Sequence, residues 1–195
     1  KDARIREALE LAIDRQALVA GLPNDASPAN QLVPRHVFGF DTSLPEVVPD
    51  RVQARALLRQ AGYAEGFDVS LHTREILKEA ALSLVDQLAT IGIRARVVVL
   101  PDPRYFDLLD RRETSLWLDR WSCTTGESGE MFENAFHSPD PARGLGGFNE
   151  SGFSDPAMAR EIEAALALED LQRLRAALAD LMSLIINDAA SAAIY

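Results

Sequence analysis

Three glutamates spaced three residues apart are the side chains of this sequence with the greatest potential for acid–base chemistry. Glu127, Glu130 and Glu133 offer carboxylates that could exchange protons with a substrate or bind a metal ion. That spacing places them along one side of a short helix, where charged side chains ordinarily face the solvent. We therefore expect no catalytic site, and a hydrolase using Glu127 and Glu130 stands only as an alternative.

The other reactive residue types do not form a recognisable site in the sequence. His36, His72 and His137 are widely separated and lack the spacing of zinc ligands, so we expect no metal site. The single cysteine, Cys123, has no histidine or lysine nearby in sequence to activate it, and we interpret it as a small buried residue. No phosphate loop, dinucleotide fingerprint or nucleophile elbow is present, and we expect no cofactor.

Composition restricts the class of partner. The 30 acidic and 20 basic residues give a net charge of −10, which disfavours nucleic-acid binding because phosphates require a basic surface. No segment has the apolar length of a membrane span, so we expect this chain not to be embedded in a membrane. With 195 residues, 47% of them hydrophobic, the chain is long enough for one well-buried core.

The pattern of apolar residues predicts an α/β fold. Residues 4–15 show the period of an amphipathic helix, with Gly21 as its stop, and Asp50 caps a helix that runs to residue 61. A strand at 67–72, a helix at 76–91 and a strand at 93–100 follow, and this order makes a βαβ unit with parallel strands. We expect further helices at 102–111, near 131–136, at 155–168 and at 170–187, and further strands at 115–121 and 192–195.

A long stretch between Pro23 and Pro49 has little periodicity. It contains Pro28, Pro34 and Pro45, and the turn-forming residues Asn24, Asp25 and Ser27 lie near its start. Long loops within compact domains are often functional, so we expect an ordered excursion.

The order of residues in the first helix is less common than its periodicity. Arg-x-Arg-x-Ala-Leu followed by Ala-Ile-Asp-Arg, at residues 4–15, resembles the helix that opens the C-terminal lobe of family 5 extracellular solute-binding proteins. Further segments resemble the same family in the same order along the whole chain. They are Leu88-x-x-Ile91-Gly92-Ile93, the run from Trp121 to Glu127 followed by Phe132, Phe148-Asn149 through Ser154-Asp155-Pro156, and the pair Glu169 and Arg173.

This resemblance implies a fold and a function. The fold would be one lobe of a type II periplasmic-binding-protein-like structure, with a mixed sheet flanked by helices. Residues 1–195 would form a single α/β lobe, a fragment of a larger two-lobed protein. That protein would not be an enzyme. It would bind a small-molecule or peptide ligand in an interlobe cleft and deliver it to the permease subunits of an ABC importer, at the membrane surface in the periplasm or another extracytoplasmic space. The alternative is the sensing lobe of a transcription regulator.

The resemblance also implies a ligand site. Trp121 would end a strand and open a loop that faces the ligand, whereas Trp117 on the same strand would pack in the core. The implied ligand-binding residues are Trp121, Ser122, Cys123, Thr124, Thr125, Glu127 and Arg35. Arg35 either meets an anionic group or is solvated.

One position departs from the pattern of the peptide-binding members. Those members have an aspartate three residues after the tryptophan, which pairs with the free amine of the peptide, and here the position is Thr124. A hydroxyl cannot neutralise an ammonium, so we expect a neutral polar ligand, such as a sugar or a modified peptide. The alternative is that another carboxylate supplies the charge, with Glu127 the nearest candidate and Glu130 the next.

Overall fold

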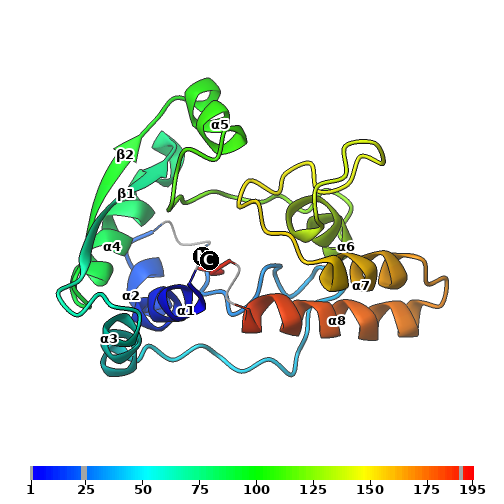
Figure 1. The fold of residues 1–195 in the computed structure, drawn as a ribbon. Helices are drawn as coiled ribbons and strands as arrows, with labels where there is room; N and C mark the ends of the chain where they lie inside the picture. The colour runs from blue at the N-terminus through cyan, green and yellow to red at the C-terminus, as the bar shows by residue number, and fades with distance from the viewer. Residues whose placement is uncertain (1, 23–25, 189–190) are drawn as a thin grey trace. The chain divides into compact units, whose positions relative to one another are not determined.

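Two compact units make up the chain. The computed structural model describes residues 2–22, 26–188 and 191–195. Unit 1 contains Lys1–Asn30, Glu46–Arg120 and Ala192–Tyr195, and unit 2 contains Gln31–Pro45 and Trp121–Ser191 (Figure 1). Each unit is assembled from separate segments of the chain, and each has its own buried hydrophobic cluster or clusters.

A βαβ arrangement forms the centre of unit 1. Strands β1 (Phe67–Thr73) and β2 (Ile93–Val99) pair in parallel, in a register that places Phe67 opposite Ile93. Helix α4 (Lys78–Ala89), preceded by the short 3-10 turn η1 (Glu75–Leu77), connects them and packs on the sheet (Figure 1). The predicted βαβ unit is therefore confirmed. We expected a mixed sheet. In the part of the chain that the structure describes, the sheet consists of this one parallel pair and is therefore not mixed.

The first predicted helix is interrupted. Instead of running unbroken toward Gly21, it forms α1 (Ala3–Ala12) and α2 (Arg15–Val19), separated at Asp14. The Asp14 carboxylate accepts the backbone N–H of Ala17 at 2.9 Å and so begins a new helix. Gln87 of α4 fixes the break, because its side chain accepts the Asp14 N–H at 2.5 Å and donates to the Asp14 carbonyl at 3.2 Å.

The next predicted helices of unit 1 are confirmed. Helix α3 (Arg51–Gln60) begins at Asp50, whose carboxylate accepts the N–H groups of Val52 at 3.0 Å and Gln53 at 2.8 Å. It packs against α1 through a cluster that includes Ala8 and Leu58. Helix α5 (Asp102–Asp110) carries Pro103 in its first turn, as predicted.

The strand predicted at residues 115–121 is wrong. This segment contacts β1 at one bridge, where the His72 N–H donates to Leu116 O at 3.1 Å and the Leu118 N–H donates to His72 O at 2.9 Å. The Leu118 carbonyl then accepts the hydroxyls of Thr73 and Tyr105, both at 3.0 Å, instead of continuing a ladder. Trp117 is half-buried and outside the hydrophobic clusters, so the expectation that it packs in the core is also wrong.

The strand predicted at residues 192–195 is likewise not formed. Isolated contacts hold this segment instead: Arg15 Nε donates to Ala193 O at 2.7 Å, and the Ala29 N–H donates to Ile194 O at 3.1 Å. A strand needs a repeating ladder, and these two contacts come from different segments.

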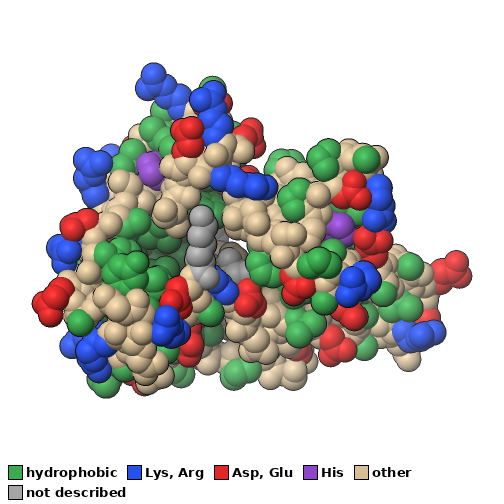
Figure 2. Space-filling view, viewed as in Figure 1, with side chains coloured by type: hydrophobic (Ala, Val, Ile, Leu, Met, Phe, Trp, Pro, Cys, Tyr) green, Lys and Arg blue, Asp and Glu red, His purple; other side chains and the backbone are tan. Residues whose placement is uncertain are grey.

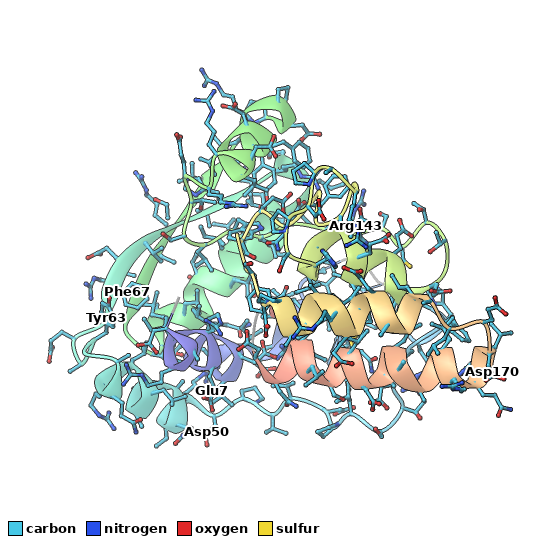
Figure 3. The ribbon with its side chains drawn as sticks, turned by 45° about the vertical axis from the view of Figure 1, so that its right-hand side comes forward. Glu7, Asp50, Tyr63, Phe67, Arg143 and Asp170 are labelled. Atoms are coloured by element: carbon cyan, nitrogen blue, oxygen red, sulfur yellow. The ribbon has the colours of Figure 1, made fainter. Side chains whose placement is uncertain are left out.

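Unit 2 is helical. A single turn of α6 (Ser128–Met131) runs into a π-helical turn, η2 (Phe132–Phe136), and α7 (Pro156–Leu166) lies beside α8 (Leu171–Asn187) (Figure 1). The two predicted helices are confirmed, and the aspartates that precede α7 and α8 cap them; Figure 3 labels the second of these, Asp170. The buried cluster between these helices includes Phe132, Ile162, Leu178, Met182 and Ile185.

The described part of the proline-rich excursion is ordered without helix or strand. The Gln31 side chain donates to Asp41 O and accepts the Asp41 N–H, both at 2.8 Å, which closes the loop between these two residues. Val33 and Val37 of this loop are buried in the unit 2 cluster. The expected turn residues Pro23, Asn24 and Asp25 lie outside the described residues.

Candidate functional site

All seven residues predicted to bind a ligand lie in unit 2. Six of them belong to residues 121–130, which we call the 121–130 loop although it includes the start of α6. The seventh, Arg35, is in the 31–45 segment, which pairs with this loop: the Phe38 N–H donates to Gly126 O, and the Ser128 N–H donates to Phe38 O, both at 2.9 Å. The Arg35 guanidinium lies over the Phe40 ring at 5.1 Å. Among the described residues it makes no hydrogen bond or ion pair to the loop, so the structure does not bring it together with the other six.

Trp121 packs against an aromatic residue that was not among the predicted site residues. Its half-buried ring meets the ring of Phe148 edge to face, with centroids 5.7 Å apart at 81°. Phe148 is 57% exposed, so the pair presents aromatic surface to the solvent. Within the described chain, the buried Trp121 Nε1–H has no acceptor.

The threonines of the loop hold a carboxylate. The hydroxyl of Thr124 donates to Glu130 Oε1 at 2.8 Å, and the N–H and hydroxyl of Thr125 donate to Glu130 Oε2 at 2.9 and 2.8 Å. These bonds favour the ionised form, and the backbone N–H of Thr125 contributes most to lowering the pKa of Glu130. None of the ion pairs between described residues involves Glu130. The loop therefore presents an oriented negative charge at the position where the sequence shows a threonine.

Glu127, the nearer candidate in sequence, does not reach Thr124 in this way. It contributes its backbone instead: its carbonyl accepts the Cys123 thiol at 3.0 Å, and its N–H donates to Thr125 Oγ1 at 3.3 Å. Cys123 is half-buried against the unit 2 cluster, and Ser122 is exposed. These residues shape the loop, and Glu130 supplies its charge.

Hydrogen bonds through Asn134 connect the backbone of Glu130 to the aromatic pair. Asn134 Nδ2 donates to Glu130 O at 2.7 Å, and the Phe148 N–H donates to Asn134 O at 3.0 Å. Together with the Trp121–Phe148 contact, these bonds link the 121–130 loop, η2 and the segment that carries Phe148 into a closed set of contacts, which we call the circuit. A sequence signal for Phe148 did exist. It is an aromatic residue next to Asn149, in a segment that the family resemblance had already indicated.

A second polar cluster braces the segment that carries Phe148. Buried His137 lies 3.0 Å from Glu163 Oε1 on α7, and Arg143 (labelled in Figure 3) donates to both oxygens of Glu163 at 2.9 and 2.7 Å. Arg143 first, and His137 second, lower the pKa of Glu163 to about 2. Asn149 Nδ2 donates to His137 O at 2.9 Å, which ties the turn after Phe148 to the same cluster.

This arrangement is suited to binding. A general acid at neutral pH needs a raised carboxyl pKa, and the pKa of Glu130 is lowered. Among the described residues, no group of three or more His, Cys, Asp or Glu side chains is placed to hold a metal ion. Nor does any helix in the described ranges have the length and apolar character needed to cross a membrane.

Comparison with known proteins identifies a family and several sequence relatives. The sequence model described as bacterial extracellular solute-binding proteins, family 5 Middle, matches residues 1–142. The glutathione-binding protein GsiB of Salmonella choleraesuis is 30% identical over 180 residues, which cover 87% of this chain and 34% of that protein. GsiB of Escherichia coli K12 is 29% identical over 176 residues, with 86% and 34% covered. The chain thus spans about a third of the length of these relatives.

Solved structures show the same fold at lower identity. DppA of Helicobacter pylori, in complex with the peptide STSA, superposes with a TM-score of 0.87 at 20% identity, covering 99% of this chain and 38% of that one. NikA of Staphylococcus aureus, in complex with Ni(L-His)2, has a TM-score of 0.86 at 20% identity, with 98% and 41% covered. The fold is α/β, of the type II periplasmic-binding-protein class.

Proposed function

The chain belongs to the bacterial extracellular solute-binding proteins of family 5, and on that premise we propose that it is one α/β lobe of the substrate-binding component of an ABC importer. The full-length receptor binds a small solute or peptide between this lobe and a second one, without changing it chemically. It delivers the ligand to permease subunits at the outer surface of the membrane, in the periplasm or an equivalent space. Ligand-driven closure of two lobes is the physical step that such delivery uses.

The observation that carries this proposal is the circuit of contacts around the 121–130 loop. Trp121 and Phe148 offer an aromatic surface, and Glu130 offers an oriented charge without a cationic partner among the described residues. Pockets that bind small ligands combine such apolar walls with a few placed polar groups. The six loop residues, Trp121 to Thr125 and Glu127, remain proposed ligand neighbours, and Glu130 and Phe148 join them.

This circuit supports a different ligand class from the one that Thr124 alone suggested. An ionised carboxylate held by three hydrogen bonds suits a ligand with an ammonium group, because the geometry is already fixed before binding. Peptides with a free amino group carry such an ammonium, and glutathione, after which the Salmonella relative is named, is one of them. We therefore propose an ammonium-bearing peptide or amino-acid derivative rather than a neutral sugar.

Calorimetry on the full-length receptor tests both parts of the proposal. We expect saturable binding of a peptide, with the peptide recovered intact, and weaker binding after its amino group is acetylated. Glu130→Gln should weaken the binding of a peptide with a free amino group by about tenfold or more, because a charge-assisted contact is lost. Glu161→Gln removes an exposed carboxylate on α7, outside the proposed ligand neighbours; it is the control and should change little.

The outcomes separate the receptor function from the ligand class. Hydrolysis of the peptide would contradict the receptor and support the hydrolase. If the peptide binds and is recovered intact, but its affinity does not change with Glu130→Gln or with acetylation, the receptor function is supported and the proposed role of Glu130 is overturned.

A further inference from the structure

We propose that unit 1 carries a second binding site, one that takes an organic anion bearing a carboxylate or phosphate group. The site is a cavity of about 340 Å³ at the C-terminal ends of α3 and α4. Its polar and glycine lining comprises Arg55, Arg59, Tyr63, Glu65, Thr90 and Gly92. The proposed ligand loop contributes nothing to it, because every residue of that loop belongs to unit 2.

The turn that ends at Gly92 lines this cavity, and it packs closely against the neighbouring turn at Gly66. Gly66 and Gly92 both have positive φ, at 71° and 92°, and a Cβ on Gly66 would lie 1.7 Å from the Gly92 carbonyl oxygen. Only glycine permits this approach between the turn before β1 and the turn before β2. Tyr63 is held as well, since its N–H donates to Leu58 O at 2.8 Å and its ring packs edge-on against Phe67 at 5.0 Å (Figure 3). These contacts hold the turns and the Tyr63 ring in place beside the cavity.

Two arginines on one wall have no acidic partner. Arg55 and Arg59 lie one helical turn apart on α3, are exposed, and form no ion pair with any described residue. Arg51, one turn earlier, extends the same row, and basic side chains lie over α3 at the lower left of Figure 2. Six other arginines are each paired with a carboxylate, namely Arg4, Arg15, Arg74, Arg94, Arg111 and Arg143, and several more, such as Arg104, are in no ion pair among the described residues. The distinguishing feature of the α3 arginines is their arrangement, because four-residue steps gather their positive charge on one side of the helix in a chain with a net charge of −10.

The helix ends at the cavity do not favour a cation. The last carbonyls of a helix attract positive charge when they are free. Here the carbonyls of the last turns are already occupied by nearby donors. The occupied carbonyls are Leu58 O, Arg59 O, Gln60 O, Gln87 O, Leu88 O and Ala89 O. Among the residues that line the cavity, only Glu65 is acidic, so the arginines determine the sign of charge that the cavity attracts.

The chemistry of the lining specifies the ligand class. A guanidinium donates two parallel N–H groups to a carboxylate or phosphate. Tyr63, 42% exposed, places a hydroxyl and a flat apolar ring beside the arginines. The volume is within the range of pockets for small organic molecules. The anionic group belongs either to a free metabolite or to an acidic side chain of a partner protein. In both cases the guanidinium N–H groups donate to its oxygens.

NMR titration of the whole chain at low ionic strength tests this site. The probes are phenyl phosphate and citrate as free anions, a polyglutamate peptide with blocked ends as the protein-like anion, and phenol as the neutral control. We expect saturable shifts at the Arg55 and Arg59 side chains and at Tyr63 with the anions and none with phenol. The double variant Arg55→Gln/Arg59→Gln should weaken binding by about tenfold or more, and Glu65→Gln should strengthen it.

Arg104→Gln supplies the matched control, because Arg104 on α5 is also exposed and has no ion pair among the described residues. Equal losses in this control and in the double variant would show diffuse charge screening and overturn the site. No saturable shift with any anion would overturn it too. Saturation by the free anions supports a metabolite, and saturation by the peptide alone supports an acidic partner protein. Because the site is in unit 1, its failure leaves the receptor proposal unaffected.

Discussion

At the scale of single residues, Glu163 makes the stability of unit 2 depend on pH. Its contacts with Arg143 and His137 hold the pKa of Glu163 at about 2 in the folded chain, below the ordinary value of 4.5. A depressed pKa contributes stability that is fully present above the unfolded value and lost as the pH falls toward the folded one. We therefore expect the free energy of unfolding to decline between pH 4.5 and about 2 through this residue.

Urea unfolding, followed by the fluorescence of Trp121 in a Trp117→Phe background, measures that decline. Glu163→Gln should lower stability at neutral pH and flatten the dependence in this window, because the variant has no carboxyl to titrate. Glu161→Gln, on the same helix and with no ion pair among the described residues, is the control and should retain the parent slope. Parallel pH curves for the parent and Glu163→Gln would refute the assignment.

At the scale of elements, the junction between Gly66 and Gly92 sets how α3 and α4 lead into the two strands. Gly66→Ala combines a strained φ with a Cβ 1.7 Å from a carbonyl oxygen, so β1 and β2 must move apart. Gly62→Ala has a similar φ of 90° but meets no atom within 4 Å, and it isolates the backbone strain.

We expect Gly62→Ala to cost about 1–2 kcal/mol and Gly66→Ala about 3 kcal/mol or more. Chemical denaturation followed by circular dichroism gives both values. Equal losses in the two variants would mean that the close approach of the two turns is not a structural constraint.

At the scale of the whole molecule, two compact units predict two regions of separate local stability. Leu178 is fully buried in the unit 2 cluster, and Ile93 is fully buried in a unit 1 cluster. Each truncation to alanine should cost about 2–5 kcal/mol. Hydrogen exchange with mass spectrometry should show the loss of amide protection chiefly in the unit that carries the substitution. Uniform loss across both units in either variant would indicate one cooperative unit.

The sequence by itself determined the elements whose signals are local. The cap at Asp50, the alternation in β1 and the helical period of α4 all depend on residues within a few turns of each other. The family resemblance likewise identified the region of the candidate site, because Trp121 and its loop are contiguous in the chain. Their role in binding a ligand stays a prediction.

Only the tertiary structure decided the features that depend on distant partners. The break at Asp14 requires Gln87, and the segment at 115–121 fails to extend the sheet because Tyr105 and Thr73 take its carbonyl. Dependence on contacts formed only in the folded chain also explains why the charge of the candidate site was not predicted. Periodicity reports which face of an element is apolar, but not which carboxylate meets a given hydroxyl. Thr124 alone suggested a neutral site, and the packing of the loop on α6 placed the charge of Glu130 there.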